Sequence, residues 1–202
     1  NKKTAITTIS MSPSAGLPVG GVVVVRTVSD NPAGASGVTN YHSLADSKNN
    51  GWTRLREHTN SPGGTAGAGV TVATFIAKIR SALTISDTIT LTISASVTAK
   101  AIAADEYSMD TVKLINAVGA NSAIGTGTTP SITLSGLASG EYLWIGHTGL
   151  EGPNGDTFTQ DSDYANNTSI GTTGGAAAGN IASRFGSRVA TLTSDTYSPT
   201  LG

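Results

Sequence analysis

The sequence predicts an all-β protein, a two-sheet antiparallel β-sandwich with a jelly-roll-like arrangement of strands. Three observations support this fold class. Apolar and hydroxyl-bearing residues alternate through stretches such as residues 88–94 (TITLTIS), which is typical of a strand with one buried and one exposed face. Such stretches recur between turns rich in Gly, Pro, Asn and Asp, as in sandwiches and barrels. Only 12% of the 202 residues are charged, so long segments are free of charges and can form strands that lie within packed sheets.

One domain is expected, because all-β sandwiches reach roughly 200 to 250 residues as single domains. We predict a sandwich over residues 20–202, preceded by an N-terminal extended segment and link over residues 1–19. Residues 4–10 alternate weakly, which is typical of an edge strand. Residues 20–29 contain four consecutive valines, and such an apolar run favours a central strand that is covered on both faces.

Residues 38–45 and 52–59 are predicted to pair as a hairpin. The segment between them, residues 46–51 (DSKNNG), ends in Asn-Gly, and these two residues readily adopt the positive φ angles of a tight turn. Residues 70–79 begin with β-branched alternation, which predicts a strand that either continues or ends in a short helical turn.

The second half of the chain predicts further strands. Residues 87–95 and 97–104 are expected to form two strands adjacent in one sheet. Other strands are expected at residues 111–118, 131–134, 141–146 and 181–194. A polar, Gly-rich loop occupies about residues 150–180, and ordered loops of this length usually carry a function or make contacts.

Charge and composition argue against several classes of partner. The net charge is −1 and the charged residues are spread thinly, so no basic patch indicates nucleic acid or an anionic membrane surface. No apolar run approaches the roughly 18 to 20 residues of a membrane span. The chain has no Cys, which excludes disulfides and thiolate ligands. Because it begins at Asn1 rather than Met, we expect a processed or partial product.

No residue pattern indicates a reaction. His42, His58 and His147 lie on separate predicted strands without a second ligand at metal-binding spacing, so we interpret them as hydrogen-bonding residues. The sequence contains no nucleophile elbow, no phosphate-binding glycine loop and no His-Glu-x-x-His motif. We therefore expect neither enzyme activity nor a cofactor.

The long loop contains the one cluster of carboxylates. Asp156, Asp161 and Asp163 offer the oxygen ligands that Ca²⁺ prefers, with Glu151 close in sequence. Solvated aspartates that cap turns explain the same residues, and we favour that interpretation. A calcium site remains an alternative, and a pair of glycosidase carboxylates is a weaker one.

Aromatic residues raise a second alternative. Trp52 and Trp144, with Tyr41 and Tyr142, are candidates for a platform that stacks on sugars. Aromatics make up only 5% of the chain, so we expect these side chains to pack in the core instead. The alternative would make this chain a lectin-like attachment module whose partner is a cell-surface glycan.

Two motifs carry a resemblance to known proteins. Residues 46–53 (DSKNNGWT) and 141–146 (EYLWIG) resemble Ser/Thr-rich β-sandwich proteins that occur among bacteriophage structural proteins and related bacterial surface proteins. Further similar segments are residues 151–153 (EGP), 156–159 (DTFT) and 196–200 (TYSPT). The resemblance spans residues 20–201. It implies a jelly-roll-like fold and a non-catalytic component of a virion exterior or cell-surface structure, and it carries over no binding residue.

Similar proteins continue past the last of these segments into another apolar strand, whereas this chain stops at Gly202. If that strand is missing, the resemblance implies an apolar groove and an open sheet edge, and open edges pair readily with another chain. We expect the N-terminal segment of a neighbouring copy to fill the vacancy by strand addition. The expected contact residues are Thr4, Ile6, Thr8 and Ile9. The alternative is that this segment pairs within its own domain.

The sequence thus favours a non-enzymatic, self-associating structural subunit outside the cell. The expected setting is a phage virion, as a capsid decoration or a tail or fibre component, or a pilus-like filament. Its partners would be copies of itself or other subunits of that assembly.

Overall fold

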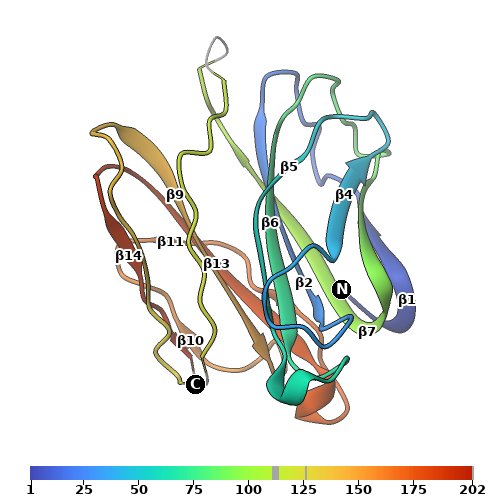
Figure 1. Cartoon of the computed structure of the whole chain (residues 1–202). Helices are drawn as coiled ribbons and strands as arrows, with labels where there is room; N and C mark the ends of the chain where they lie inside the picture. The colour runs from blue at the N-terminus through green and yellow to red at the C-terminus, as the bar shows by residue number, and fades with distance from the viewer. Residues whose placement is uncertain (111–113, 126, 202) are drawn as a thin grey trace.

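The computed structural model describes residues 1–110, 114–125 and 127–201, and it is built from antiparallel strands (Figure 1). The strands are β1 (Lys2–Met11), β2 (Val22–Asp30), β3 (Gly37–Val38), β4 (His42–Asp46), β5 (Thr53–Asn60), β6 (Val70–Lys78), β7 (Ile89–Tyr107), β8 (Ile132–Leu134), β9 (Glu141–Glu151), β10 (Phe158–Thr159), β11 (Ala165–Asn166), β12 (Ile170–Gly171), β13 (Ile181–Thr191), β14 (Asp195–Tyr197) and β15 (Thr200–Leu201). Two short 3₁₀ turns, η1 (Pro62–Gly64) and η2 (Ala177–Gly179), complete the regular structure of the described ranges. The predicted all-β, antiparallel sandwich is confirmed, and its jelly-roll topology stays a prediction.

The valine run forms the centre of the larger sheet, as the sequence predicts. All nine residues of β2 are buried, and β2 lies between β7 and β6 in the order β1-β7-β2-β6-β5-β3. Val23 and Val25 point into a core that they share with Phe75 of β6 and with side chains from the first half of β7. On the opposite face, Val22 and Val24 pack against Phe185 of β13. Both faces of β2 are therefore covered by protein.

β7 is one strand of nineteen residues, so the prediction of two adjacent strands within residues 87–104 is wrong. Its first five residues pair with β4 and its last eight with β2, while β1 pairs along the other edge. Ile89, Leu91 and Ile93 from the first part share the core with Val23 and Val25. The sheet therefore curls so that β1, β4 and the start of β7 cover one face of β2 and β6.

The predicted hairpin within residues 38–59 forms only at its open end, where Val38 of β3 pairs with His58 of β5. β4 pairs with β7, and β5 pairs with β6 and β3. The turn after β4 is held by Asp46, whose Oδ1 accepts hydrogen bonds from the backbone N–H groups of Lys48 and Asn50. Asn49, with φ of 58°, takes the left-handed conformation that the sequence assigned to residues 50 and 51.

The second layer is built on β9 and β13, which pair in register over eleven residues (Figure 1). β11 and β12 pair with the other edge of β13, so the long loop contributes short strands to this sheet. Two small ribbons, β8 with β14 and β10 with β15, complete the layer. Trp144, Tyr164 and Tyr197 form its own apolar cluster. Residues 114–118 form no strand, and residues 111–113 of that predicted strand lie outside the described residues.

The helical turns in the described ranges are three residues long, and none has the length or apolar character to cross a membrane.

A glycine allows the two layers to approach each other. A Cβ atom at Gly149 of β9 would lie 2.2 Å from Cγ1 of Val72 on β6. We expect Gly149→Ala to lower the free energy of unfolding by about 1–3 kcal/mol, the usual cost of overpacking. Urea denaturation measures this loss. Gly51→Ala is the matched control, because its Cβ would meet no atom within 4 Å, and equal stability of the two variants would contradict the close approach.

Candidate functional site

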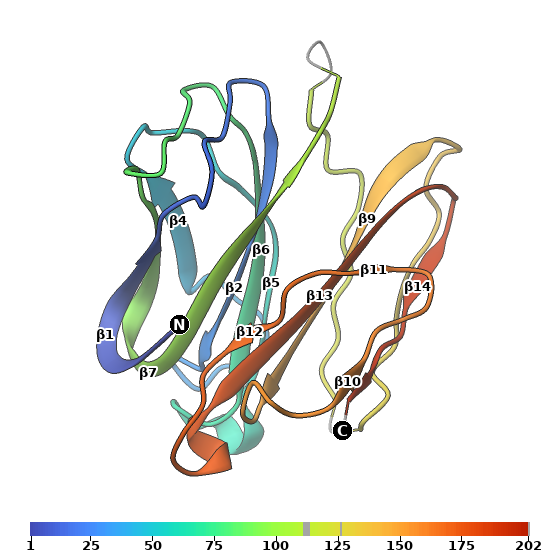
Figure 2. The ribbon, with the colours of Figure 1, turned by 180° about the vertical axis from the view of Figure 1, so that it is seen from behind.

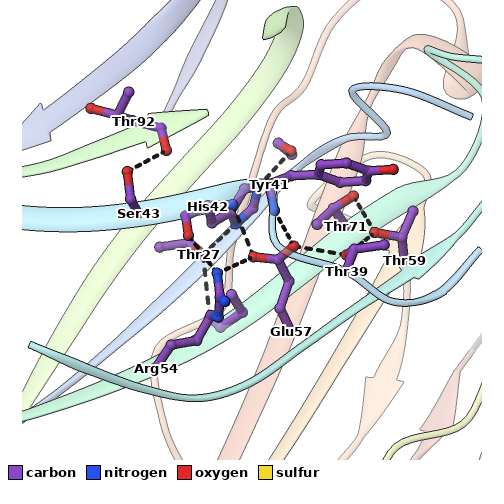
Figure 3. Close-up of polar contacts among 12 residues, drawn as sticks. Thr27, Thr39, Tyr41, His42, Ser43, Arg54, Glu57, Thr59, Thr71 and Thr92 are labelled. Atoms are coloured by element: carbon purple, nitrogen blue, oxygen red, sulfur yellow. Dashed lines mark hydrogen bonds and ion pairs between the residues drawn. The ribbon is translucent and has the colours of Figure 1, made fainter. Parts of the chain in front are cut away.

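A buried polar cluster connects β5 to the segment that leads into β4 (Figure 3). Glu57 of β5 is 2% exposed, and its carboxylate accepts hydrogen bonds from the backbone N–H groups of Tyr41 (2.5 Å) and His42 (2.9 Å). The hydroxyl of Thr39 donates a third, at 2.7 Å, and Arg54 Nη1 lies 3.4 Å from Oε2. The Glu57 side chain thus satisfies main-chain groups that a β4–β5 ladder would otherwise pair.

The His42 ring contacts two hydroxyls of β2. Thr27 Oγ1 is 2.8 Å from Nδ1, and Ser29 Oγ is 2.9 Å from Nε2. Because Ser29 donates its own proton to the carbonyl of Asp30, its oxygen is free to accept from Nε2–H. The single proton of Thr27 then goes to Nδ1 at 2.8 Å, in preference to the more distant carbonyl of Ala73 at 3.3 Å. Both contacts suit a neutral ring. Burial lowers the pKa of His42 to about 4, against the opposing charge of Glu57.

The contact between Ser29 and His42 has the length of a nucleophile–base hydrogen bond, but its surroundings indicate a structural role. Ser29 and Thr27 are fully buried and His42 is 1% exposed, so a substrate has no access to either hydroxyl. Glu57 bonds the main chain of His42 rather than its ring. We therefore assign this cluster to the stability of the fold.

The other two histidines differ from each other. His147 of β9 joins the two layers, because Nδ1 lies 2.9 Å from Thr74 Oγ1 on β6 and Nε2 lies 2.7 Å from Ser183 Oγ on β13. Burial lowers its pKa to about 3, and the charge of Arg26 adds to this effect. His58 is half-buried, and its Nδ1 has no hydrogen-bond partner among the described residues.

The three candidate aspartates have separate partners. Asp161 accepts hydrogen bonds from the backbone N–H groups of Asp163 and Ser198, as expected for a turn-capping residue. Asp163 forms an ion pair with Arg188 at 3.0 Å. Asp156 accepts from Arg184 through its backbone carbonyl. Within the described part of the chain, no three His, Cys, Asp or Glu residues are grouped in a way that could hold a metal ion.

The two tryptophans belong to different apolar clusters. Trp52 packs against the core of the larger sheet and donates its Nε1–H to Asp46 Oδ2 at 2.7 Å. Trp144 is 6% exposed and packs with Tyr164 and Tyr197, while the ring of Tyr142 meets it edge-on. A shared sugar-stacking platform is therefore not formed by these residues.

The N-terminal segment forms β1, an edge strand beside β7 (Figure 2). Of its predicted contact residues, Ile9 is buried, Ile6 is half-buried, and Thr4 and Thr8 are exposed. β1 pairs with β7 of its own chain, which is the alternative that the sequence leaves open. Exchange of this strand between copies stays a prediction.

The far end of β1 is held by a residue that the sequence analysis missed. Lys100 of β7 is fully buried, and its ammonium donates hydrogen bonds to the carbonyls of Thr4 (2.8 Å), Val97 (2.7 Å) and Thr98 (3.3 Å). Burial lowers the pKa of Lys100, and the charge of Asp30 opposes this shift. The sequence did contain one indication that Lys100 is buried. Lys100 is two residues before the apolar Ile102, and residues two apart in a strand lie on the same face.

A groove of about 890 Å³ runs between the two layers. Its apolar lining includes Val22, Leu55, Ile76, Ile115, Leu143 and Ile145. β9 forms one wall, and β13 is the single strand with which it pairs among the described residues. In the described part of the chain, an apolar groove therefore lies beside the edge of β9 that faces away from β13. The vacancy that the resemblance implies stays a prediction. Comparison of the chain with protein-family models, with curated protein sequences and with solved structures found no match.

Proposed function

We propose that this chain is a non-enzymatic structural subunit that assembles with copies of itself outside the cell, on a virion exterior or in a pilus-like filament, by exchange of β1. The observation that carries this proposal is the limited burial of the side chains of β1. Of its ten residues only Ile9 is buried, so backbone pairing with β7 provides most of its attachment. The β1 of another copy offers the same backbone groups to β7.

The link after β1 supplies a hinge. Leu17 and Leu83 exchange backbone hydrogen bonds of 2.8 and 3.1 Å, which fix the end of the link to the domain. A strand that leaves its own β7 would turn within residues 12–16 (SPSAG), which contain Pro and Gly. Exchange of an identical element between copies adds little energetic cost, and head-to-tail exchange that does not close produces a filament. A net charge of −1 adds little repulsion between copies.

A pair of engineered cysteines tests this exchange. Ser10 of β1 lies opposite Thr90 of β7, and their hydroxyls are 2.8 Å apart on the exposed face. The natural chain has no Cys, so Ser10→Cys with Thr90→Cys forms one defined disulfide. Oxidation in dilute solution is expected to hold β1 on its own β7 and to abolish polymers seen by electron microscopy. Oxidation after assembly is expected to give a covalent ladder on a non-reducing gel.

The control is a disulfide of the same kind elsewhere in the domain. Thr133 of β8 and Thr196 of β14 face each other with hydroxyls 2.8 Å apart. Their double cysteine variant should cross-link within one subunit and assemble as the natural chain does. Polymers that persist when β1 is locked would exclude strand exchange. A natural chain that stays monomeric at high concentration and decorates no larger particle would exclude the structural role.

A further inference from the structure

The pairing of β1 with β7 contains a bulge next to Lys100. Lys3 lies opposite Ala99 and Ile6 lies opposite Val97, so three steps along β1 match two steps along β7. One extra residue of β1 is therefore accommodated between Lys3 and Ile6. Thr4 falls within this bulge, and its carbonyl accepts the hydrogen bond from Lys100 Nζ.

The chemistry of Lys100 suits this position. An ammonium group has three N–H donors and no acceptor, and the three carbonyls at Thr4, Val97 and Thr98 use all of them. A buried charge is tolerated when its hydrogen bonds are satisfied, and two of the three carbonyls belong to β7 itself. The third has to come from β1. The site formed by Lys100, Val97 and Thr98 is therefore complete only when a carbonyl from a docked strand reaches it.

The side chains of β1 specify its register weakly. Thr4, Thr8 and Ser10 are exposed hydroxyl residues, and Ile9 is the buried one. Strands with little difference between their faces are prone to slip along their partners. A slip of two residues would preserve the inward and outward faces while moving the bulge away from Lys100.

We propose that Lys100 is a specificity-determining residue that fixes the register of docked β1 by binding the carbonyl of its bulge. The same contact would select the β1 segment of a second copy, and this part rests on the proposed strand exchange. The recognised ligand is an extended strand with a carbonyl at its bulge that is free to accept a hydrogen bond. In β1 this carbonyl belongs to Thr4, on the N-terminal side of the buried Ile9.

Cysteine pairs report the register directly. Ser10 and Thr90 form the in-register pair, whereas Ser10 with Thr92, and Thr8 with Thr90, would meet only after a slip of two residues. Each double cysteine variant is made with Lys100 and with Lys100→Met, which keeps most of the stem but has no N–H donors. We expect the ratio of in-register to slipped disulfide to fall about tenfold in Lys100→Met, the effect of losing one hydrogen bond from a charged group.

Lys3→Met is the matched control, because it removes the same ammonium group from an exposed position of β1. There, water can replace the hydrogen bond that Lys3 donates to the carbonyl of Gly174, so this bond contributes little to the register. Its ratio should stay unchanged. If Lys100→Met does not fold, Lys100→Gln provides the same test. Its side chain keeps two N–H donors, so the ratio of in-register to slipped disulfide should fall by less. The disulfides are measured on monomer in dilute solution, so the result is independent of assembly. An unchanged ratio in both Lys100 variants, or an equal fall in Lys3→Met, would overturn the role of Lys100.

Discussion

Lowering the pH from 7 to 4 is expected to cost the domain about 3 kcal/mol of unfolding free energy through His42 alone. Burial lowers the pKa of His42 to about 4, from the ordinary value of 6.5 that the unfolded chain retains. Between these two values the unfolded chain binds a proton that the folded chain does not. The contribution of His42 to the free energy of unfolding is therefore fully present above pH 6.5. It decreases as the pH falls through this window and is lost below the pKa of the folded state.

Two other groups act in the same direction. Burial lowers the pKa of His147 to about 3, so its contribution is lost over a window that extends further into acid. Hydrogen bonds from Thr84 and Ser47 hold the pKa of Asp87 below its usual range, so this carboxylate loses its contribution as the pH falls below its ordinary value of 3.8. Acid unfolding should therefore begin near pH 6 and steepen as the pH falls.

Urea denaturation at a series of pH values, followed by circular dichroism, measures this loss. His42→Asn should be less stable at pH 7, because the hydroxyls of Thr27 and Ser29 lose their shared partner, and its unfolding free energy should depend less on pH between 6.5 and 4. His58→Asn is the comparison, since the half-buried ring of His58 has no hydrogen-bond partner at Nδ1 within residues 1–110, 114–125 and 127–201. An unfolding free energy of the natural chain that is constant from pH 7 to pH 4 would contradict the neutral, buried state of His42.

Sequence patterns predicted β2 well and β7 poorly, and the reason is local. The valine run of β2 is buried on both faces, and this follows from composition alone. In β7 the pairing with β1 jumps from Val97 to Thr92 while β1 advances only from Ile6 to Thr8. The alternation itself continues through this irregularity, since Ile93, Val97 and Ala99 are all buried. The pattern therefore gave no support for dividing the strand at residue 96.

The hairpin prediction was inaccurate for a different reason. A turn signal at residues 46–51 is consistent with a hairpin, but the partner of β4 is chosen by packing with β7, more than 40 residues further along the chain. Asp46 and Glu57 then satisfy the main chain with their side chains, where a ladder was expected. Burial of Glu57 was equally hidden, because charged residues are seldom fully buried. For Lys100 the alternation placed the residue on the face of Ile102, but it did not identify the carbonyls that Lys100 binds.

Glu57→Ala is expected to lower the free energy of unfolding by about 3–5 kcal/mol, as when one partner of a buried charged network is removed. The change leaves the backbone N–H groups of Tyr41 and His42 without their acceptor, whereas the hydroxyl of Thr39 keeps that of Thr59 as a partner. Arg54 also loses its carboxylate. Glu57→Gln keeps one oxygen and should lose less, about 1–3 kcal/mol, because part of the network remains satisfied.

The control for Glu57→Ala is Glu141→Ala, at the exposed first residue of β9, which should change stability by no more than about 0.5 kcal/mol. Amide hydrogen exchange locates the effect: the N–H groups of Tyr41 and His42 should exchange much faster in Glu57→Ala, while those of β9 should not. The Glu57 carboxylate links β5 to the start of β4, beside the hydrogen bond from Arg54 to the carbonyl of His42. This pattern of exchange would therefore mean that side chains of β5 hold β4 to the larger sheet. Similar losses in the two variants, or unchanged exchange at Tyr41 and His42, would show instead that β4 depends on its pairing with β7.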